Sequence, residues 1–514
     1  MRNKAIMVTE IMSRRSSTDR SVLDRSRVFL PQAGWLPIGV AMASALVFML
    51  VRAHLIDDTY IALSYARNLA FHGHWGLLAE GTTNTATSPL NVLCLAVLTF
   101  VVRDAVLAAG VLYVACQAVL VLALRRLGVA TGLPGWFPVL TITALTVNPL
   151  LLSSIGMEVG LGAAGLVWLL VLSVERRPFA FGVVAGTLTL VRLDLLIFVT
   201  LIFVARRQFW VGGRRSVRGA VLVAAPWFVF SWVALGAAVP DTLIIKTLQG
   251  AKRAWGEWEF GNGLGLYWQG MPGQTVLAFL PVMLALPAGI RWLSLVVRKD
   301  TASRRLLSFA VLAVAGAVYS LAYVQLQVPP YHWYYGPGIV AATVFACAVA
   351  AGFARRAERG LSLIVVTALL VTSVAGYAHA GLPRDFAPLT TNYTSSEQYA
   401  RIGRDLARLA SGRSIASADE IGVLAYTCDC AILDVFSDRG RMPSAIVELE
   451  ARTGRFTRGL LRVNFAFFDY TMRPREPDLA LLRIHGAPPP NYLATWTISA
   501  PLSRTTQLYL VSVS

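Results

Sequence analysis

The sequence predicts a polytopic α-helical membrane protein of about eleven apolar segments, followed by a smaller C-terminal α/β domain. Of its 514 residues, 56% are hydrophobic and only 14% are charged, whereas about 25% of the residues of a soluble domain are charged. The hydrophobic residues fall in long runs, which end after residue 379 as charged residues become frequent. This composition, with only five cysteines, excludes a soluble enzyme, a disordered chain, a coiled coil and a disulfide scaffold.

The excess of positive charge marks loops rather than a nucleic-acid surface. The formal net charge is +18, but Arg and Lys come in short runs between apolar segments, as in the cytoplasmic loops of membrane proteins. We therefore expect a lipid bilayer and no nucleic acid among the partners. Residues 1–34 form a basic tail, which we expect in the cytoplasm. Residues 35–51 follow as an uncleaved first span of roughly 26 Å, just long enough to cross a bilayer.

The basic runs also fix the direction of the later spans. Further apolar segments lie near 89–102, 105–124, 136–150, 154–174, 179–206, 217–236, 274–297, 304–324, 337–354 and 360–378. The basic pairs expected in the cytoplasm are Arg125-Arg126, Arg176-Arg177, Arg206-Arg207, Arg298-Lys299 and Arg355-Arg356. This arrangement requires segment 89–102 to dip into the membrane from outside without crossing it. It also requires segment 179–206 to break into two short spans at Arg192-Leu193-Asp194.

The chain is expected to fold as three parts. They are a cytoplasmic basic tail (1–34), a transmembrane module (35–379) with an outer catalytic loop at 54–88, and an extracytoplasmic α/β domain (380–514). In the last part, a capping box at Thr394-x-x-Glu397 or Ser395-x-x-Gln398 precedes a predicted helix over 399–409. Strands are predicted over 414–418, 430–435 and 506–513.

Two adjacent carboxylates stand just after the first span, in Ile56-Asp57-Asp58-Thr59-Tyr60. Repulsion between them raises the pKa of one, and a carboxylate here could accept a proton from an incoming hydroxyl group. Two other roles stay open. Asp is a favoured N-cap residue and 59–70 is predicted to be helical, and the pair could bind a divalent cation. We expect at least one of Asp57 and Asp58 to be catalytic.

Charged residues within apolar segments cost about 2.5–3.5 kcal/mol each and are usually functional. Glu158 is a lone acid in a long apolar stretch, and Arg192 and Asp194 are two residues apart in another. They either pair with one another or contact a substrate, whose phosphate leaving group would need a cation. Lys246, in the predicted outer loop 237–273, is a further cation at the level of the lipid phosphates.

Aromatic and hydroxyl-bearing residues gather in the predicted outer loops. One cluster comprises Tyr331, His332, Tyr334 and Tyr335. Aromatic residues anchor membrane proteins at the interface, but this cluster is larger than an anchor requires and could contact phosphate or hydroxyl groups. Tyr60 follows the aspartate pair. Asn84 lies in a hydroxyl-rich loop that suits sugar hydroxyls or forms an ordinary turn.

No segment carries a strong metal motif. His72 and His74 flank a glycine without a third ligand nearby, so we interpret them as the polar tips of a turn. Cys428 and Cys430 are one residue apart, a poor zinc motif without a second pair, and are interpreted as structural. We expect no metal ligands and no certain cofactor, with a divalent cation at the aspartate pair left open.

These residues occur in segments that resemble polytopic glycosyltransferases of the GT-C superfamily, which use polyprenyl-phosphate sugars and have an Asp in the first outer loop. The resemblance is closer to actinobacterial arabinofuranosyltransferases of the terminal β-(1→2) type, which act on arabinogalactan and lipoarabinomannan. The matching segments are IDDTYIALSYARNL (56–69), TSPL (87–90), GMEVGL (156–161), LVRLDLL (190–196), VPDTLIIK (239–246), YHWYYGP (331–337) and ADEIGVLAY (418–426). The chain departs from the family in having Arg192-Leu193-Asp194 and Pro240-Asp241-Thr242, where Arg-Pro-Asp/Glu and Pro-Asn-Thr are common.

The resemblance implies a multi-pass enzyme of the plasma membrane that moves a sugar from a polyprenyl-phosphate donor to a cell-wall glycan on the outer face. It implies catalysis by Asp57 or Asp58, and donor-phosphate contacts from Arg192, Lys246 or His332. The donor would resemble decaprenyl-phosphoryl arabinofuranose. The other expected substrate-binding residues are Tyr60, Asn84, Glu158, Asp194, Tyr331, Tyr334 and Tyr335.

Other functions stay open at this stage. An enzyme of the same superfamily could transfer mannose or another hexose. A transporter or flippase of lipid-linked sugars is a rival from another class, although such proteins often show internal repeats and midplane charge, whereas here no repeat is visible and the charge gathers at one face. A structural partner of a wall-synthesis complex would not need Asp57 and Asp58.

Overall fold

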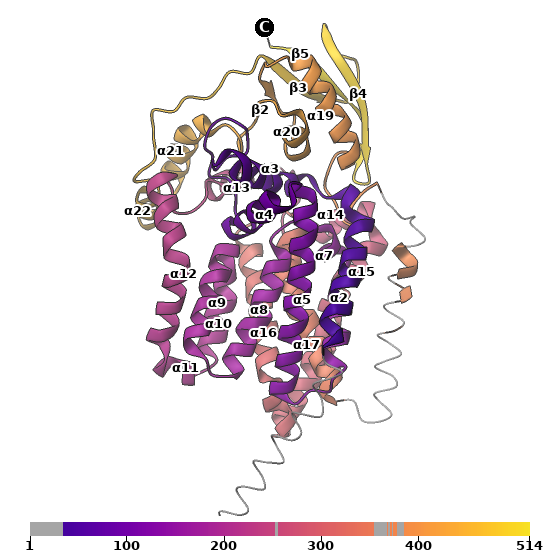
Figure 1. The fold of residues 1–514 in the computed structure, drawn as a ribbon, viewed down its shortest axis with the longest axis vertical. Helices are drawn as coiled ribbons and strands as arrows, with labels where there is room; N and C mark the ends of the chain where they lie inside the picture. Colours follow the sequence, from indigo (N-terminus) through magenta and orange to yellow (C-terminus); the bar gives the residue numbers. More distant parts are fainter. Residues whose placement is uncertain are drawn as a thin grey trace, which may run out of the picture.

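The computed structural model describes residues 34–251, 255–353, 367, 371–372, 374–377 and 385–513. Figure 1 shows a bundle of helices with a smaller α/β domain at one end, which we call the domain end. The predicted tail up to residue 33, the pair Arg355-Arg356 and most of the predicted segment 360–378 lie outside the described residues.

Six helices in the described part of the chain are long and apolar enough to cross a membrane. They are α2 (Trp35–Val51), α5 (Ala105–Thr131), α12 (Gly213–Ala234), α15 (Pro272–Val297), α16 (Thr301–Gln325) and α17 (Gly336–Phe353). Shorter apolar helices are α4 (Pro89–Val102), α6 (Phe137–Thr146), α8 (Val159–Val174), α9 (Pro178–Val191) and α10 (Leu196–Val204). Helix α2 has the predicted bounds.

The outer surface of the bundle is apolar. Leu222 of α12 is 66% exposed, and Leu286 and Ile290 of α15 are each 70% exposed. Contiguous exposed apolar surface of this kind is rare on soluble monomers and marks contact with lipid or a partner. Together with the six long helices, it identifies a multi-pass membrane protein.

Two of the predicted segments break where polar residues interrupt them. Helix α9 ends at Val191, and a 3₁₀ turn at Leu193–Leu195 leads into α10, so the predicted break at Arg192-Leu193-Asp194 is confirmed. The predicted segment 136–150 also breaks, into α6 and a short helix α7 (Pro149–Ser153). Asn148 caps α7 by accepting hydrogen bonds from the N–H groups of the next turn.

Close packing of α9 on α12 depends on residues without side chains. A Cβ on Gly182 would lie 1.9 Å from the carbonyl oxygen of Ser216, and a Cβ on Gly219 would lie 2.5 Å from that of Phe179. The two backbones can therefore approach each other in a way that larger residues prevent.

Four further helices lie between the bundle and the C-terminal domain or beside them. These are α3 (Asp57–His72), α13 (Thr242–Ala251), α14 (Gly263–Gly270) and the 3₁₀ helix His332–Tyr335, which leads into α17. The predicted helix over 59–70 is thus confirmed as part of α3. Helices α13 and α14 lie within the predicted outer loop 237–273, where the sequence analysis expected no helix. Helix α4 has only 14 residues, about 21 Å, which is shorter than the hydrocarbon core of a bilayer.

The C-terminal domain is built on a five-stranded sheet of order β2-β1-β3-β5-β4. The strands are β1 (Ile415–Ala416), β2 (Ile432–Leu433), β3 (Leu479–Ile484), β4 (Tyr492–Ala500) and β5 (Ser503–Ser512). The first three pair in parallel, and β5 pairs antiparallel with β3 and β4. The three predicted strands are present, although two of them are only two residues long. Strands β3 and β4 were not predicted.

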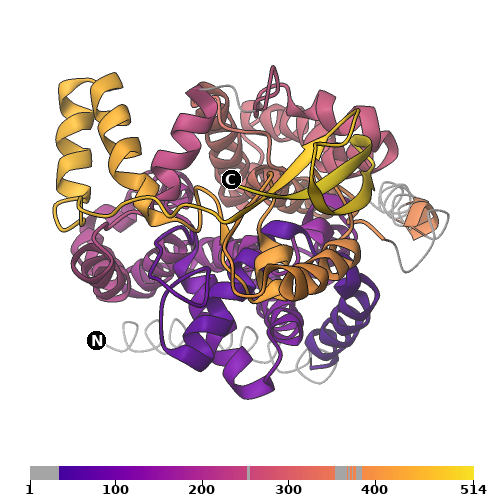
Figure 2. The same cartoon turned by 90° about the horizontal axis from the view of Figure 1, so that it is seen from above.

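Helices complete this domain and attach it to the bundle. They are α19 (Ser396–Ala410), α20 (Gly422–Cys428), α21 (Met442–Arg452) and α22 (Arg455–Asn464). Ser395 caps α19 by accepting a hydrogen bond from Gln398 N, so the second predicted capping position is the one used. Figure 2 shows α21 and α22 on the opposite side of the domain end from the sheet. One hydrophobic cluster joins Tyr65 and Trp75 to Leu406 and Leu424, so the domain packs directly on α3.

We expect Gly182→Ala to lower the thermal unfolding temperature of the detergent-solubilised protein, because the new Cβ would force α9 and α12 apart. Gly289→Ala in α15 is the matched control, since a Cβ there meets nothing within 4 Å. That change should leave the unfolding temperature unchanged or raise it, because Gly in a helix interior costs roughly 0.5–1 kcal/mol relative to Ala. Equal effects of the two substitutions would contradict this packing.

Candidate active site

Asp57 caps a helix of the C-terminal domain. Its carboxylate accepts hydrogen bonds from the backbone N–H groups of Ile421 (3.2 Å), Gly422 (2.8 Å) and Val423 (2.8 Å), at the start of α20. An anion here satisfies N–H groups that have no partner within the helix and interacts favourably with the helix dipole. A Cβ on Gly422 would lie 1.9 Å from the Asp57 carbonyl oxygen, so the contact is tight. Asp57 is 4% exposed.

A second carboxyl group belongs to the same buried site. Glu420 accepts hydrogen bonds from Tyr393 N (3.1 Å) and from the side-chain amide of Asn392. Burial, together with the negative charge of Asp57, raises the pKa of Glu420 to about 8. Burial also raises the pKa of Asp57, against the opposing effect of the three amides of α20.

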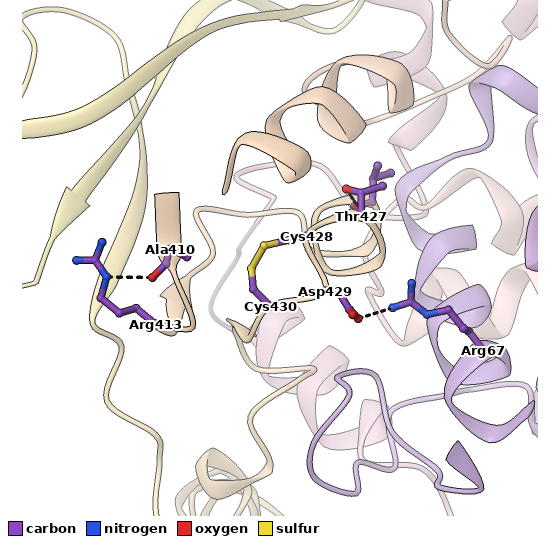
Figure 3. Close-up of a disulfide and its surroundings, with 8 residues drawn as sticks. Arg67, Ala410, Arg413, Thr427, Cys428, Asp429 and Cys430 are labelled. Carbon is purple, nitrogen blue, oxygen red and sulfur yellow. Dashed lines mark hydrogen bonds and ion pairs between the residues drawn. A yellow bond between two sulfur atoms is a disulfide. The ribbon is translucent and has the colours of Figure 1, made fainter. Parts of the chain in front are cut away.

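The other end of α20 is attached to the same helix, α3. Arg67 donates one hydrogen bond to Tyr426 O (2.9 Å) and pairs with Asp429 (3.2 Å), as Figure 3 shows for the ion pair. A disulfide joins Cys428 to Cys430 on either side of Asp429, in agreement with the structural interpretation of these cysteines. Helices α3 and α20 are thus joined at both ends.

Asp58 faces away from this contact and lines a cavity of about 50 Å³ at the domain end. The polar residues of the cavity include Asp58, Ser88, Asn91, Glu158, Thr242 and Lys246, and the large apolar ones are Met157, Trp333 and Phe436. Phe436 belongs to the C-terminal domain, so the cavity is closed by both parts of the chain. No hydrogen bond from another described residue reaches the Asp58 carboxylate, in contrast to the three that hold Asp57.

Burial raises the pKa of Asp58 to about 7, against the opposing effect of Lys246 and with smaller contributions from Asp57 and Glu158. A carboxyl group with a pKa near the working pH can both accept and release a proton. Burial raises the pKa of Asp57 as well, so what distinguishes the two adjacent carboxylates is that Asp58 lines the cavity and Asp57 does not.

Lys246 provides an uncommitted cation in the same cavity. Its ammonium group bonds the hydroxyl of Tyr334 and lies 4.9 Å from the ring centroids of Tyr331 and Tyr334. Among the described residues no carboxylate lies within ion-pair distance of it. Burial lowers the pKa of Lys246. An aromatic cage with no counter-ion leaves the positive charge available to an anionic ligand.

Arg192 is committed to internal partners. It forms ion pairs with Glu158 (2.8 Å) and Asp194 (2.5 Å), and its guanidinium lies 4.8 Å from the ring centroid of Tyr334. Asp194 also accepts a hydrogen bond from Tyr323. The structure therefore brings Glu158, Arg192 and Asp194 together as a paired network, and of these three only Glu158 lines the cavity.

The remaining residues of the predicted site lie around the cavity rather than in its lining. The Tyr60 ring packs edge-on against Tyr426, 5.3 Å away. Asn84 donates hydrogen bonds to Ser231 Oγ and Ala237 O, both at 3.1 Å, and so holds the connection that leads into α13. Tyr335 donates to Phe260 O at 2.7 Å and stacks on that ring.

His332 is buried beside the cavity wall. It is 1% exposed, its Nε2 lies 3.4 Å from Ser153 O, and its ring meets Tyr267 edge-on. Trp333, the next residue, is the one that lines the cavity. The aromatic segment predicted from the sequence thus divides, with Tyr331 and Tyr334 around Lys246 and with His332 and Tyr335 in the surrounding packing.

Several cavity residues were missed by the sequence analysis. Asn91 is a polar residue in a largely apolar helix, a pattern that can indicate a buried functional side chain. Trp333 was quoted within the aromatic segment without a role. Phe436 comes from the C-terminal domain, and no local pattern links it to residues almost 400 positions earlier in the chain.

No group of three His, Cys, Asp or Glu side chains comes together within the described ranges in a way that could hold a metal ion. The rings of His72 and His74 are 6.4 Å apart, and His74 Nε2 lies 3.0 Å from Leu78 O. This geometry is that of a turn with polar side chains.

The sequence matches no protein-family model, and no curated protein matches it significantly. Solved structures do match the fold. ArnT from Cupriavidus metallidurans, solved bound to undecaprenyl phosphate, is 14% identical to this chain. The match covers 93% of this chain and 98% of the ArnT chain, with a TM-score of 0.54. At this identity the likeness shows the fold alone. The shared fold is a membrane-helix bundle carrying a domain at one end.

Two other solved structures are less similar. The arabinofuranosyltransferase AftD from Mycobacteria is 12% identical, with 93% of this chain matching 40% of that chain at a TM-score of 0.47. The oligosaccharyltransferase AglB from Archaeoglobus fulgidus, in complex with an inhibitory peptide and a dolichol-phosphate, is 11% identical, with 88% of this chain matching 70% of that chain at 0.44. With TM-scores below 0.5, neither likeness carries an argument about this chain.

The geometry predicts unequal consequences for the two aspartates. Asp57→Ala should destabilise the protein by on the order of 2 kcal/mol, because it leaves three buried N–H groups without an acceptor. Asp58→Ala should destabilise the protein less than Asp57→Ala does, since it removes no hydrogen bond to another described residue. Thermal unfolding of the two purified variants in the same detergent measures this difference. A larger loss with Asp58→Ala would contradict the assignment of Asp57 as the cap.

Proposed function

We propose that this protein is a membrane glycosyltransferase that moves a sugar from a polyprenyl-phosphate donor to a hydroxyl group of a glycan acceptor. The observation that carries the proposal is the presence, in one cavity, of the Asp58 carboxylate and the Lys246 cation, neither of which forms an ion pair with a described residue. The GT-C fold supports the same class of reaction. ArnT, which has this fold, was solved with undecaprenyl phosphate bound, and a lipid phosphate is the kind of anion that Lys246 could bind.

The reaction assigns one role to each group. The acceptor oxygen forms a bond to the anomeric carbon of the sugar, while the bond from that carbon to the phosphate oxygen breaks. The bonding electrons leave with the polyprenyl phosphate, whose growing negative charge Lys246 stabilises. Asp58 accepts the proton of the acceptor hydroxyl. Atoms and charge balance without a further reactant.

The proposed donor sugar is arabinofuranose, carried by decaprenyl phosphate, and the proposed acceptor is a cell-wall glycan. This finer assignment is supported by the seven sequence segments that resemble actinobacterial arabinofuranosyltransferases. The C-terminal domain supplies Phe436 to the cavity and is proposed to bind the acceptor glycan.

We place the cavity at the extracytoplasmic face of the plasma membrane. The basic pairs of the bundle predict this direction. The Cys428–Cys430 disulfide supports it, because disulfides persist in oxidising compartments and are rare in the cytosol. Glu158, Arg192 and Lys246 then lie near the level of the outer lipid phosphates.

We expect purified protein in nanodiscs to transfer labelled arabinofuranose from decaprenyl-phosphoryl arabinofuranose to a short synthetic arabinan. Asp58→Asn should lower the transfer rate by about 10²–10⁴-fold, the usual contribution of a general base. Lys246→Ala should lower it by about 10²-fold or more, because the leaving phosphate loses its cation. Product formation is measured by chromatography of the labelled glycan.

Asp104→Asn and Lys299→Ala are matched controls, since both residues are exposed and lie outside the cavity. Each should retain the activity of the parent protein. If the protein transferred sugar only from a polyprenyl-phosphate hexose, the proposed reaction class would stand, but the donor sugar would be a hexose and not arabinose. Undiminished transfer by both Asp58→Asn and Lys246→Ala would overturn the proposed roles.

The pH dependence of kcat/KM follows from the same two groups. Asp58 accepts a proton only when ionised, so its pKa of about 7 predicts a fall of about tenfold per pH unit below that value. The lowered pKa of Lys246 predicts that the alkaline fall begins at lower pH than for an ordinary lysine. Lys246→Arg should shift the alkaline fall upward, because arginine stays protonated. A profile that is flat from pH 5 to pH 8 would exclude Asp58 as the base.

A further inference from the structure

Two buried oxygen atoms, on residues that line the cavity, have no partner within the described part of the chain. They are Ser88 Oγ and Asn91 Oδ1, on side chains whose residues are 5% and 1% exposed, and both residues line the cavity that holds Asp58. A buried polar atom without a hydrogen bond costs roughly 1–3 kcal/mol and is uncommon in native proteins. Two of them in one cavity point to a ligand that supplies the missing bonds.

The orientation of Asn91 is fixed by its own amide group. Asn91 Nδ2 donates to Gly156 O at 3.1 Å, so the atom left without a partner is the carbonyl oxygen. The segment between α7 and α8, which contains Gly156, also contacts the residue after Asp58, because Thr59 Oγ1 donates a hydrogen bond to Ile155 O at 3.2 Å. Asn91 is therefore held in register with the catalytic end of α3.

Ser88 stands at the N-cap of α4 but does not cap it. Serine is favoured at this position because its hydroxyl usually accepts a hydrogen bond from the first turn, yet no such bond forms here. Ser88 and Asn91, which stand three residues apart at the start of α4, both line the same cavity.

The chemistry of these atoms restricts what they bind. A carboxamide oxygen only accepts hydrogen bonds, and an ionised phosphate has no proton to donate. A sugar hydroxyl donates one and can also accept from Ser88. The Lys246 cation in this cavity thus suits a phosphate group. The hydrogen-bond acceptors at the start of α4 suit the hydroxyl groups of a sugar.

We propose that Asn91, assisted by Ser88, binds a hydroxyl group of the transferred sugar and thereby determines which sugars are accepted. The inference rests on the proposed function and deepens it by assigning the sugar-binding side of the cavity. The lipid phosphate lies at Lys246 and the sugar lies toward α4, in the cavity that Asp58 also lines.

The test compares two lipids that differ only in the sugar. Binding of decaprenyl phosphate and of decaprenyl-phosphoryl arabinofuranose is measured for the full chain in nanodiscs, by competition with a labelled decaprenyl phosphate. Asn91→Ala should weaken binding of the sugar-bearing lipid by about 5- to 10-fold and leave binding of decaprenyl phosphate unchanged. Ser88→Ala should have the same effect to a smaller extent. Lys246→Ala should weaken both.

Thr99→Val is the matched control. Thr99 lies on the same helix, is 0% exposed and has an unpartnered hydroxyl, but it does not line the cavity. The Thr99→Val variant should bind both lipids as the parent protein does.

Donors lacking single sugar hydroxyls give a second readout. The deoxy-donor that lacks the hydroxyl bound by Asn91 should bind the parent protein more weakly and should bind Asn91→Ala no worse than the complete donor does.

The possible results separate the inference from the function on which it rests. If the parent protein binds no lipid phosphate, the proposed function fails and the inference fails with it. If the parent protein binds both lipids and Asn91→Ala behaves as Thr99→Val does, only the inference is overturned. An equal loss for both lipids that added Mn²⁺ reverses would also overturn it, and would identify Asn91 as a metal ligand instead.

Discussion

The buried hydrogen bonds between Asp57 and the start of α20 are the contact on which the rest of the site depends. A carboxylate that is 4% exposed is costly unless it is fully bonded, and the three amides of α20 provide that bonding. The bond pattern requires the C-terminal domain to sit in one position on α3. The same position brings Phe436 into the cavity and places Arg439 against Asp241 in a buried ion pair of 2.9 Å, at the start of the helix that carries Lys246.

This arrangement explains how two adjacent aspartates serve different purposes. Successive residues at the start of a helix point in different directions, so Asp57 turns toward the C-terminal domain while Asp58 turns toward the cavity. The two cations divide in the same way. Arg192 is neutralised by Glu158 and Asp194, whereas Lys246 contacts aromatic rings and the Tyr334 hydroxyl and forms no ion pair with a described residue. Asp57 and Arg192 therefore bond to other parts of the chain, whereas Asp58 and Lys246 are left to face the cavity.

The sequence allowed the membrane-spanning part to be predicted well, because apolar length and charge are local properties. The bounds of α2, the break at Arg192 and the helix after Asp57 all followed from them. The roles of individual charged residues did not, since pairing depends on contacts between distant segments. No pattern near Asp57 indicates that residues 421–423 would occupy its carboxylate. Nor does any pattern near Asn84 indicate that its side-chain amide would donate hydrogen bonds to Ser231 and Ala237. Strands β3 and β4 escaped prediction because the pairing of their residues across the sheet, rather than a strong alternation, defines them.

The most direct test of this account is a cryo-electron microscopy structure of the Asp58→Asn variant in nanodiscs with decaprenyl-phosphoryl arabinofuranose. The account predicts the phosphate group within hydrogen-bond distance of Lys246 Nζ, the sugar between residue 58 and α4, and Asp57 still bonded to the amides of α20. A phosphate bound at Arg192 with its ion pairs broken, or an Asp57 released from α20 and turned toward the donor, would contradict it.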